Sequence, residues 1–424
     1  MKPTSRFSSS RLPFSSPFFY GWIIVGLAAG INFFTGPGQT YSVSTFIDSY
    51  INEFGWSRSH VSSMYSLGTL FAGLLMGFVG GIYDRIGHRL TTSFLAILFG
   101  FACLGMSYVN SVPMLFAGFF FIRLLGQGSL GLCGSTLVPQ WFLKKRGKAF
   151  SLMTIGGTFS SALLPPLNTW LIMNFGWRLS WVFWGLILWL ITAPLAAFFI
   201  RNRPEDVGLK PDNVDPSIIL DQPDGETLFE EAWTPKEALK TRTFWLLIFC
   251  TMIPSAIVTG LIFHQVSIMS RVGLSPEVAA LILSLMAIVR LPVLVVAGPI
   301  ADRVQPRYLM AGTLGILLVS IMVLYLMNSI YLAIIYALLL GVRMGIQGVV
   351  LGVIWPNYYG RRHISGIRGL TFMADVVGSA MGPLAYGLGF DLFGGYNQLL
   401  LFSMVFPAMG ILAALLATKP VKSM

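Results

Sequence analysis

Stretches of about twenty apolar residues recur along this chain, and each is long enough to cross the core of a bilayer as one helix. Of the 424 residues, 55% are hydrophobic and only 11% are charged, a composition too apolar for a soluble domain. We therefore predict an all-α polytopic membrane protein with twelve transmembrane helices, several of them long enough to be tilted or bent. The twelve segments are approximately 20–47, 57–82, 91–109, 112–140, 148–173, 178–200, 243–267, 275–300, 308–327, 330–356, 365–390 and 396–418.

The net charge of +11 follows the predicted topology and does not indicate a nucleic-acid partner. Counted from a cytoplasmic N-terminus, all but six of the 28 Lys and Arg residues fall on one side of the membrane. The exceptions are Arg58, Arg178 and Arg271 on the opposite side, and Arg123, Arg290 and Arg343 within helices. This asymmetry is the positive-inside signal, so we expect a multi-pass plasma membrane protein, of the bacterial inner membrane type, with both termini in the cytoplasm.

The longest polar stretch divides the twelve segments into six and six. It carries most of the seventeen acidic residues and several Pro and Gly, which favours a solvated linker with one short surface helix near 235–241. The predicted organisation is a cytoplasmic N-terminal tail (1–19), an N-terminal six-helix bundle (20–200), a cytoplasmic linker (201–242), a C-terminal six-helix bundle (243–418) and a cytoplasmic C-terminal tail (419–424).

The two halves repeat one another at an offset of about 218 residues, which indicates two parallel, pseudo-symmetric six-helix repeats. The matching landmarks are Gly80-x-x-x-Asp84-Arg85-x-Gly87-x-Arg89 with Gly298-x-x-x-Asp302-Arg303-x-x-x-Arg307, Arg123-x-x-x-Gln127-Gly128 with Arg343-x-x-x-Gln347-Gly348, Pro37 with Pro254, and Pro165 with Pro383.

On these motifs the chain resembles the major facilitator superfamily over essentially its whole length. The Gly80–Arg89 loop is that family's most recognisable signature, with its degenerate copy in the second half. Further stretches resemble the oxalate/formate antiporter and monocarboxylate transporter branch: Tyr20-Gly21-Trp22-Ile23-Ile24, Glu53-Phe54-Gly55-Trp56-Ser57-Arg58, Arg290-Leu291-Pro292 and the linker opening Arg203–Pro211. The resemblance implies secondary transport by two bundles that rock around a site at the bilayer midplane.

No enzyme is indicated. The chain has no phosphate-binding Gly-rich loop with Lys, no metal-ligand spacing and no Ser-centred elbow, so we expect no cofactor and no metal. Without an ATP site, the energy must come from a solute or proton gradient. Small-residue pairs such as Gly378-x-x-x-Gly382 are explained by packing within a bundle, so we expect a monomer.

The repeated loop has a mechanical rationale as a gate. A carboxylate at the cytoplasmic end of one helix can bind Arg residues and helix ends of the other half through charge-assisted hydrogen bonds. Gly80 lets helices approach closely, and Gly87 permits a tight turn. The expected gating motif is Gly80, Asp84, Arg85, Gly87 and Arg89, with Asp302, Arg303 and Arg307 in the second copy. A basic loop that only sets topology is the alternative.

Arg290 lies in the middle of the apolar stretch 281–296, where a charge is costly unless it faces protein, water or a partner. Its guanidinium keeps its charge and offers a planar fork that matches a carboxylate. In the resembled branch the arginine of the eighth helix binds the substrate carboxylate, which implies this role for Arg290. A structural ion pair with Asp375 is the alternative.

Asp375 is the only carboxylate that we place at membrane depth. It belongs to a polar and small stripe on one face of its helix, made of Thr371, Asp375, Gly378, Ser379 and Gly382. The resembled oxalate exchanger carries a lysine in this helix, and one cation with an acid nearby fits a monoanion better than a dianion. We expect Asp375 to serve in proton coupling or charge balance, or in a static pair. His264 is either an interface residue or a proton relay.

The remaining candidates line the helices that the resemblance assigns to the cavity. Gly36-Pro37-Gly38 should kink the first helix, and Pro254 lies at the matching place in the seventh; paired interruptions point to the binding region. Gln39 and Tyr41 could supply a donor and an aromatic wall, and Gln127 and Gln347 could contact the ligand, or all four could serve packing. We expect Arg123 and Arg343 to be structural.

The sequence therefore predicts a secondary active transporter of a small organic anion, most consistent with a monocarboxylate such as lactate, pyruvate or formate, driven by protons or a counter-anion. The alternative within transport is a carrier of a larger amphipathic compound, such as a vitamin, siderophore or drug. A sensor built on the same scaffold is disfavoured, because the linker and tails are too short for a signalling domain.

Overall fold

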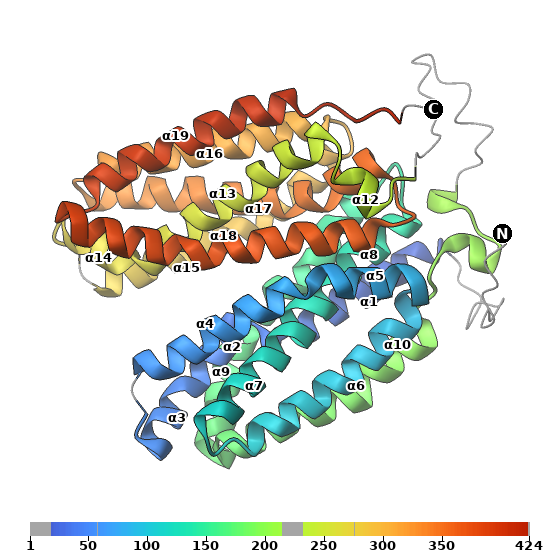
Figure 1. Ribbon diagram of the computed structural model, residues 1–424, viewed down its shortest axis with the longest axis horizontal. Coiled ribbons are helices and arrows are strands. Elements are labelled where there is room, and N and C mark those ends of the chain that lie inside the picture. Colours follow the sequence, from blue (N-terminus) through green and yellow to red (C-terminus); the bar gives the residue numbers. More distant parts are fainter. Residues whose placement is uncertain (1–17, 57, 214–231, 275, 423–424) are drawn as a thin grey trace.

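Two bundles of long helices lie side by side in the computed structural model, which describes residues 18–56, 58–213, 232–274 and 276–422 (Figure 1). Every regular element in this described part is helical. The first bundle runs from blue to green and the second from yellow to red. The start of the first helix and the end of the last lie at the same end of the molecule, which we call the terminal end; the opposite end is the distal end.

The first bundle contains six crossings built from several shorter elements. These are α1 (Gly21–Phe34) with η1 (Gly36–Gly38), α2 (Thr40–Val43), η2 (Ser44–Phe46) and α3 (Ile47–Phe54); α4 (Arg58–Leu74) with α5 (Met76–Ile86); α6 (His88–Ser107); α7 (Val112–Ile122) with η3 (Arg123–Leu130) and α8 (Gly131–Trp141); and α9 (Arg146–Ile187) with η4 (Leu188–Thr192) and α10 (Ala193–Phe199). Gly176, at φ 80° and ψ 160°, interrupts α9 and separates the fifth crossing from the sixth.

The second bundle is more regular. Its elements are α13 (Arg242–Phe263), α14 (Gln265–Ser270), α15 (Pro276–Ala301), α16 (Pro306–Tyr325), α17 (Ile330–Tyr359), α18 (Ile364–Phe393) and α19 (Asn397–Leu416). Between the bundles the described parts of the linker form η5 (Pro204–Val207), η6 (Pro211–Asn213) and α12 (Pro235–Ala238). The surface helix expected near 235–241 is therefore present but shorter, and residues 214–231 of the linker lie outside the described residues.

The predicted fold class is confirmed, because each of the twelve predicted segments has a helical counterpart in one of the two bundles. In the described part of the chain, nine helices are long and apolar enough to cross a membrane, or ten if the bent pair of α4 and α5 counts as one span. That pair bends by 43°. Helix α18, which carries Arg368 and Asp375, is not among the nine.

The first and seventh helices differ where matching breaks were expected. The first helix ends at Phe34, and Gly36–Gly38 forms a tight 3₁₀ turn in which a methyl group at Gly38 would overlap the Ile122 carbonyl oxygen of the fourth crossing. In contrast, α13 runs unbroken through Pro254. Pro37 is flanked by two glycines and Pro254 is not, so only the first half has the backbone freedom to break there.

Close helix contacts inside the first bundle depend on small residues, as expected where apolar side chains gain little by leaving lipid. Gly156 of α9 lies against the backbone of α1, and a methyl group there would overlap the Ala29 carbonyl oxygen. Gly26 of α1, by contrast, has no atom within 4 Å of the position that a methyl group would take.

We therefore expect Gly156→Ala to lower the melting temperature of the purified protein in detergent, because overpacking costs about 1 to 3 kcal/mol. Gly26→Ala is the matched control, with no steric cost and a better helix former. Differential scanning fluorimetry compares the two. Equal melting temperatures for both variants would contradict the α1–α9 packing described above.

Candidate functional site

Two carboxylates close the terminal end by binding helix N-termini of the opposite bundle. Asp84, at the end of α5, accepts hydrogen bonds from the backbone N–H groups of Ser365 (3.1 Å) and Gly366 (2.7 Å) in the first turn of α18. Asp302, just after α15, accepts from the N–H groups of Gly147 and Lys148 in the first turn of α9. Unpaired N–H groups and the helix dipole make a helix N-terminus a favourable place for an anion.

These two contacts are one arrangement made twice, in opposite directions. Asp84 reaches from the first bundle to the second, and Asp302 reaches from the second to the first. The glycine four residues before each carboxylate lets the backbones meet. A methyl group at Gly80 would overlap the Ser365 carbonyl oxygen, and one at Gly298 would come within 3.0 Å of the Gly147 carbonyl oxygen. Gly87, at φ 92°, makes the turn from α5 to α6.

The arginines of the two loops have different surroundings from the carboxylates. Arg85 and Arg303 are exposed, Arg89 donates to the Ala197 carbonyl oxygen (2.6 Å), and Arg307 stacks on Tyr308 of its own bundle. The role of these four side chains in a gate stays a prediction. Besides Asp84 and Asp302, further residues that bridge the bundles are ones that sequence reasoning missed.

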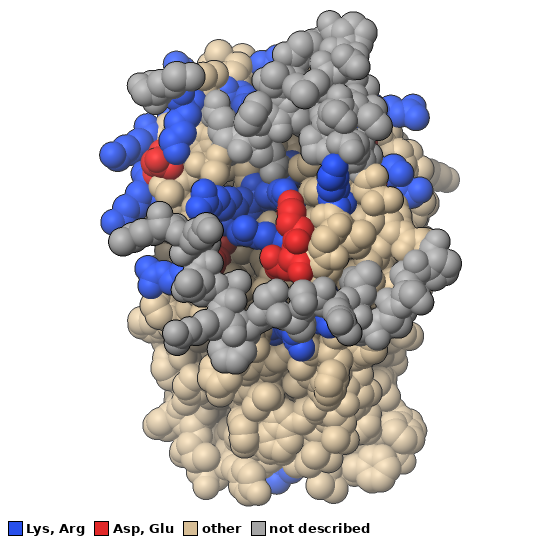
Figure 2. Space-filling view, turned by 90° about the vertical axis from the view of Figure 1, so that its right-hand side faces the viewer, with Lys and Arg blue, Asp and Glu red and all other residues tan. Residues whose placement is uncertain are grey.

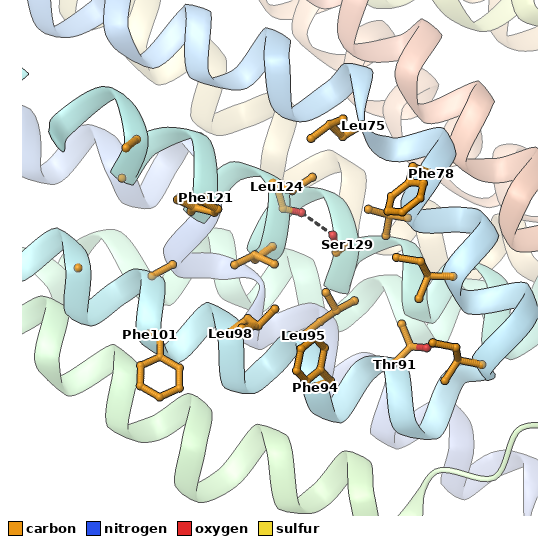
Figure 3. A pocket seen from close by; sticks show the side chains of 18 of the residues that line it. Leu75, Phe78, Thr91, Phe94, Leu95, Leu98, Phe101, Phe121, Leu124 and Ser129 are labelled. Atoms are coloured by element: carbon orange, nitrogen blue, oxygen red, sulfur yellow. Dashed lines mark hydrogen bonds between the residues drawn. The ribbon is translucent and has the colours of Figure 1, made fainter. Parts of the chain in front are cut away.

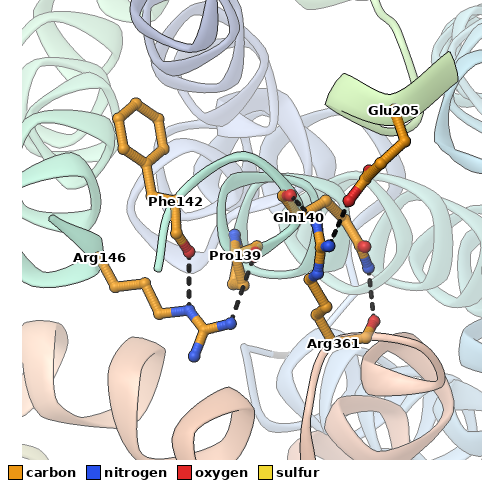
Figure 4. Close-up of polar contacts among 6 residues, drawn as sticks. All are labelled: Pro139, Gln140, Phe142, Arg146, Glu205 and Arg361. Atoms are coloured by element: carbon orange, nitrogen blue, oxygen red, sulfur yellow. Dashed lines mark hydrogen bonds and ion pairs between the residues drawn. The ribbon is translucent and has the colours of Figure 1, made fainter. Parts of the chain in front are cut away.

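Four of those residues link the bundles at the terminal end, and Figure 4 draws three of them, Gln140, Arg146 and Arg361. Gln140 of α8 donates to the Arg361 carbonyl oxygen, and Arg361 donates back to that of Gln140, both at 2.6 Å. Arg146 donates to Asn357 of α17 (2.7 Å). Arg146 and Arg361 belong to basic clusters beside helix starts, and these clusters were the sequence signal that could have identified them. The clusters were instead interpreted only as the basic residues that set membrane topology. Figure 2 shows Lys and Arg gathered around a few acidic side chains at this end.

The linker adds a layer over the closed end. Glu205 pairs with Arg361, and Pro235 of α12 lies against Gly366, beside the Asp84 carboxylate. Glu237 caps α12 through the Thr234 N–H and pairs with Lys422; these contacts lower the pKa of Glu237 to about 2. Burial raises the pKa of Asp302, whereas the N–H groups of Gly147 and Lys148 act to lower it. The hydrogen bonds of Asp84, Asp302, Gln140, Arg146 and Arg361 between the bundles all lie at the terminal end.

Arg290 lies on α15 where the two bundles face each other. Its side chain is half-buried, its Nε atom is enclosed, and it has no hydrogen-bond or ion-pair partner among the described residues. The guanidinium is within electrostatic range of Tyr41 of α2, in the other bundle. The Tyr41 hydroxyl donates to Ser160 (2.9 Å). A permanent cation of one bundle and a phenol of the other are therefore within electrostatic range across the interface.

Asp375 does not lie beside Arg290. The charged side chain within electrostatic range of its carboxylate is Arg368, seven residues earlier on the same helix, and the Thr251 hydroxyl of α13 is beside that carboxylate. The spacing of two helical turns was visible in the sequence, but Arg368 was counted with the basic residues that flank the membrane. The alternative expected for Asp375, an ion pair with Arg290, is not present among the described residues, and Arg368 acts on the carboxylate only over a longer electrostatic range.

The glutamines expected at the cavity are in different surroundings. Gln39 donates to the Thr35 hydroxyl in the same crossing at 3.2 Å, and Gln347 accepts from Thr313 of α16 at 2.9 Å, so both are engaged inside their bundles. Gln127 lines a small cavity between η3 and Phe372 and Val376 of α18. Of the three, only Gln127 borders space between the bundles.

The two symmetry-related arginines also differ. Arg123 begins a π-helical segment, donates to Thr69, to Thr40 and to the Gly38 carbonyl oxygen, and stacks on Tyr65. Arg343 lies in the regular α17, only 4% exposed, and its Nε atom has no partner among the described residues. The contacts of Arg123 thus join three crossings of its bundle.

His264, where α13 meets α14, lies 3.2 Å from the Tyr396 hydroxyl near the distal end.

A large cavity lies away from all these residues. It measures about 890 Å³ and is lined by apolar side chains of α5, α6 and α7, with Thr91 and Ser129 as its hydroxyl groups (Figure 3). Among the described residues, no group of three or more His, Cys, Asp or Glu could hold a metal ion.

Comparison with known proteins gives the family. Residues 23–383 match the model of the Major Facilitator Superfamily. Human monocarboxylate transporter 2 is 28% identical over 178 residues (40% of this chain, 35% of that one), and the efflux pump radE of Floropilus chiversii is 30% identical over 128 residues (30% of this chain, 23% of that one). The matches thus span about a third or less of these relatives.

The solved structure of the proton:xylose symporter XylE superposes with a TM-score of 0.69 at 16% identity, over 93% of this chain and 94% of that one. This likeness confirms the fold of two six-helix bundles. The expectation that the chain is a transporter and not an enzyme is also confirmed, because the family model covers most of its length. The chain belongs to the major facilitator superfamily of multi-pass membrane transporters.

Proposed function

We propose that this protein is a secondary active transporter of a small organic anion, a monocarboxylate of the lactate, pyruvate or formate type. The observation that carries the proposal is Arg290, an enclosed cation at the interface of the bundles without a counter-charge among the described residues. A charge at membrane depth is costly unless it is paired, so it marks a binding or conduction site. An anionic substrate supplies the missing partner.

The chemistry of Arg290 favours a carboxylate with one negative charge. The guanidinium forms two parallel hydrogen bonds with a carboxylate, and it stays charged at any accessible pH. The charge that acts on Asp375 is Arg368 and not Arg290, so we assign Arg290 to the substrate. Tyr41 supplies a wall for the small apolar part of the acid. The similarity to a monocarboxylate transporter supports the same substrate class.

The transport cycle follows from which end is closed. We assign the terminal end to the cytoplasm, since most Lys and Arg residues belong to that side. With the carboxylates on their helix N-termini, this conformation closes the cytoplasmic side, and the ribbons of the bundles separate toward the distal end (Figure 1). Substrate enters from outside, and rocking of the bundles breaks these contacts to release it inside. Proton symport or anion exchange drives the cycle.

A second candidate is export of a larger amphipathic compound. The similarity to an efflux pump and the apolar cavity between α5, α6 and α7 favour it. That cavity contains no charged side chain among its lining residues, so it would not select an anion. A thermal-shift screen of the purified protein separates the two candidates. A melting temperature raised only by short acids supports the first candidate, and one raised only by bulky heterocycles supports the second.

Replacement of Arg290 tests the anion site. We expect Arg290→Ala to reduce uptake of the transported acid into proteoliposomes by about thirtyfold or more, because losing a buried charged partner costs at least about 2 kcal/mol. Arg290→Lys, which keeps the charge and loses the fork, should retain intermediate activity. Radiolabelled lactate, pyruvate and formate are the probes. Uptake by Arg290→Ala at the level of the unmodified protein would refute the assignment.

The closed end gives a separate prediction. Ser365 is fully buried at the contact with Asp84, so Ser365→Cys should react slowly with a membrane-impermeant maleimide. Adding Asp84→Asn or Asp302→Asn weakens a charge-assisted bond and should speed the labelling severalfold. Arg303→Ala, next to Asp302 but exposed, is the matched control and should leave the rate unchanged. Unchanged labelling in both Asn variants would show that these carboxylates do not hold the end closed.

A further inference from the structure

Arg343 of α17 is a buried cation that the proposed transport site does not use. Its side chain is 4% exposed, its Nε atom is enclosed, and it has no hydrogen-bond or ion-pair partner among the described residues. A guanidinium carries five N–H donors and keeps its charge. A charge that is withdrawn from water and left without a partner is strongly destabilising, so a group that compensates Arg343 is missing from the protein atoms around it.

The matching arginine of the first bundle shows what Arg343 lacks. Arg123 donates to the Gly38 carbonyl oxygen at the break of the first helix, at 3.0 Å, and to the Thr69 hydroxyl of the second crossing, also at 3.0 Å. In the second bundle α13 runs unbroken, so no turn presents a carbonyl oxygen in this way. At the repeat offset, the position of Thr69 is taken by the apolar Ala287. The second bundle therefore keeps the cation of the repeat without its acceptors.

Arg343 also points away from the helix that carries Arg290. Gly341 and Gly345 form the side of α17 that lies against α15, because a methyl group at either would come within 2.8 Å of α15 atoms. Arg343 is two residues from each of them, which is about 200° around the helix axis. The two buried arginines of this bundle therefore lie on opposite sides of the contact between α15 and α17, and they belong to different sites.

Gln347 adds a second donor on the face of Arg343. The two residues are four apart in a regular helix, so their side chains are neighbours. The Oε1 atom of Gln347 accepts a hydrogen bond from the fully buried Thr313 of α16 at 2.9 Å. This bond orients the amide and leaves its N–H groups as donors. The guanidinium and the amide thus present donors side by side, and the group that fits between them is an acceptor with negative charge.

The apolar core of the second bundle is divided at the level of Arg343. In the first bundle, the buried apolar side chains that the structure describes form one continuous cluster. In the second, Leu340 and Leu317 belong to a distal cluster, whereas Val350 and Leu314 belong to a separate cluster nearer the terminal end. Arg343 lies between Leu340 and Val350 on the same side of α17. The division therefore coincides with the unpartnered cation.

The neighbouring helices supply no counter-charge. Helices α13, α16, α17 and α19 contain no Asp or Glu. In α18, Asp375 has Arg368 and not Arg343 within electrostatic range. A compensating charge for Arg343 must therefore come from outside these four helices, and it must be small enough to enter a place that leaves the side chain 4% exposed.

We propose that Arg343 and Gln347 form a second anion site, inside the second bundle, for a small monovalent inorganic anion of the size of chloride. One fixed cation balances one negative charge, and enclosure favours an anion that gives up its water more readily than sulfate or phosphate does. The bound anion accepts from the guanidinium and the amide and completes the core between the two apolar clusters. It stabilises the second bundle and is distinct from the solute that Arg290 binds.

Thermal unfolding of the purified full-length protein in detergent tests the site. Chloride is raised at constant ionic strength against methanesulfonate, a larger anion. A ligand that binds only the folded state raises the melting temperature by mass action, so we expect a saturating rise of about 3 °C. Arg343→Met should show no chloride response. Without chloride it should melt above the unmodified protein, because it removes an uncompensated buried charge.

The matched variants distinguish this site from other effects of chloride. Arg123→Met, at the symmetry-related position, should melt lower at every chloride concentration and keep the response, since it leaves buried acceptors without their donor. Arg290→Ala should also keep the response. Gln347→Glu places a fixed carboxylate beside Arg343, so it should melt higher without chloride and lose the response. The proposal is overturned by an unmodified protein that does not respond, or by a response that Arg343→Met keeps and Arg290→Ala loses.

Bromide gives a measurement that needs no variant. Crystals of the unmodified protein grown in sodium bromide should show an anomalous peak within hydrogen-bond distance of both the Arg343 guanidinium and the Gln347 amide. A map with no peak there, in which protein atoms accept from the guanidinium, would contradict the site.

Discussion

A charge inside a membrane-embedded bundle needs a partner, and the polar residues of this protein are arranged around that cost. Asp84 and Asp302 are each bound by the N-terminus of a helix in the other bundle, and Arg123 is bound by groups on two other crossings of its own bundle. Where partners are complete, the contacts hold the structure together. Where they are incomplete, at the Nε atom of Arg290 and the Oδ1 atom of Asp375, enclosed polar atoms have no hydrogen-bond partner among the described residues.

The internal repeat accounts for the two matching contacts of Asp84 and Asp302 at the terminal end. The proposed substrate site around Arg290 lies where the two halves differ. Both bundles place a carboxylate after a glycine-bearing helix, which produces the same contact twice and makes the terminal end strong when closed. The unpaired Arg290 has no equivalent at depth in the first bundle. That bundle instead breaks its first helix at Pro37, close to Tyr41, whose phenol is within electrostatic range of Arg290. In the proposed site, one half supplies the charge and the other supplies an aromatic residue.

Sequence reasoning predicted the parts that depend on periodicity and spacing. Apolar segments predicted the helices, and the offset between Asp84 and Asp302 predicted matching contacts at one end. Contacts that depend on helix rotation were not predictable in the same way. Arg368 counted as a flanking basic residue because nothing in its neighbours shows that it turns inward. Pro254 suggested a break that α13 does not have, since whether a proline breaks a helix depends on the surrounding backbone.

The central claim is that a single fixed cation selects the cargo by its negative charge. Isothermal titration calorimetry with matched pairs of ligands tests it most directly, for example lactate against lactamide, which have nearly the same shape and differ in charge. The account predicts that within each pair only the carboxylate binds, with an affinity that falls as salt concentration rises. Equal binding of the acid and its amide, or binding of the amide alone, would contradict it.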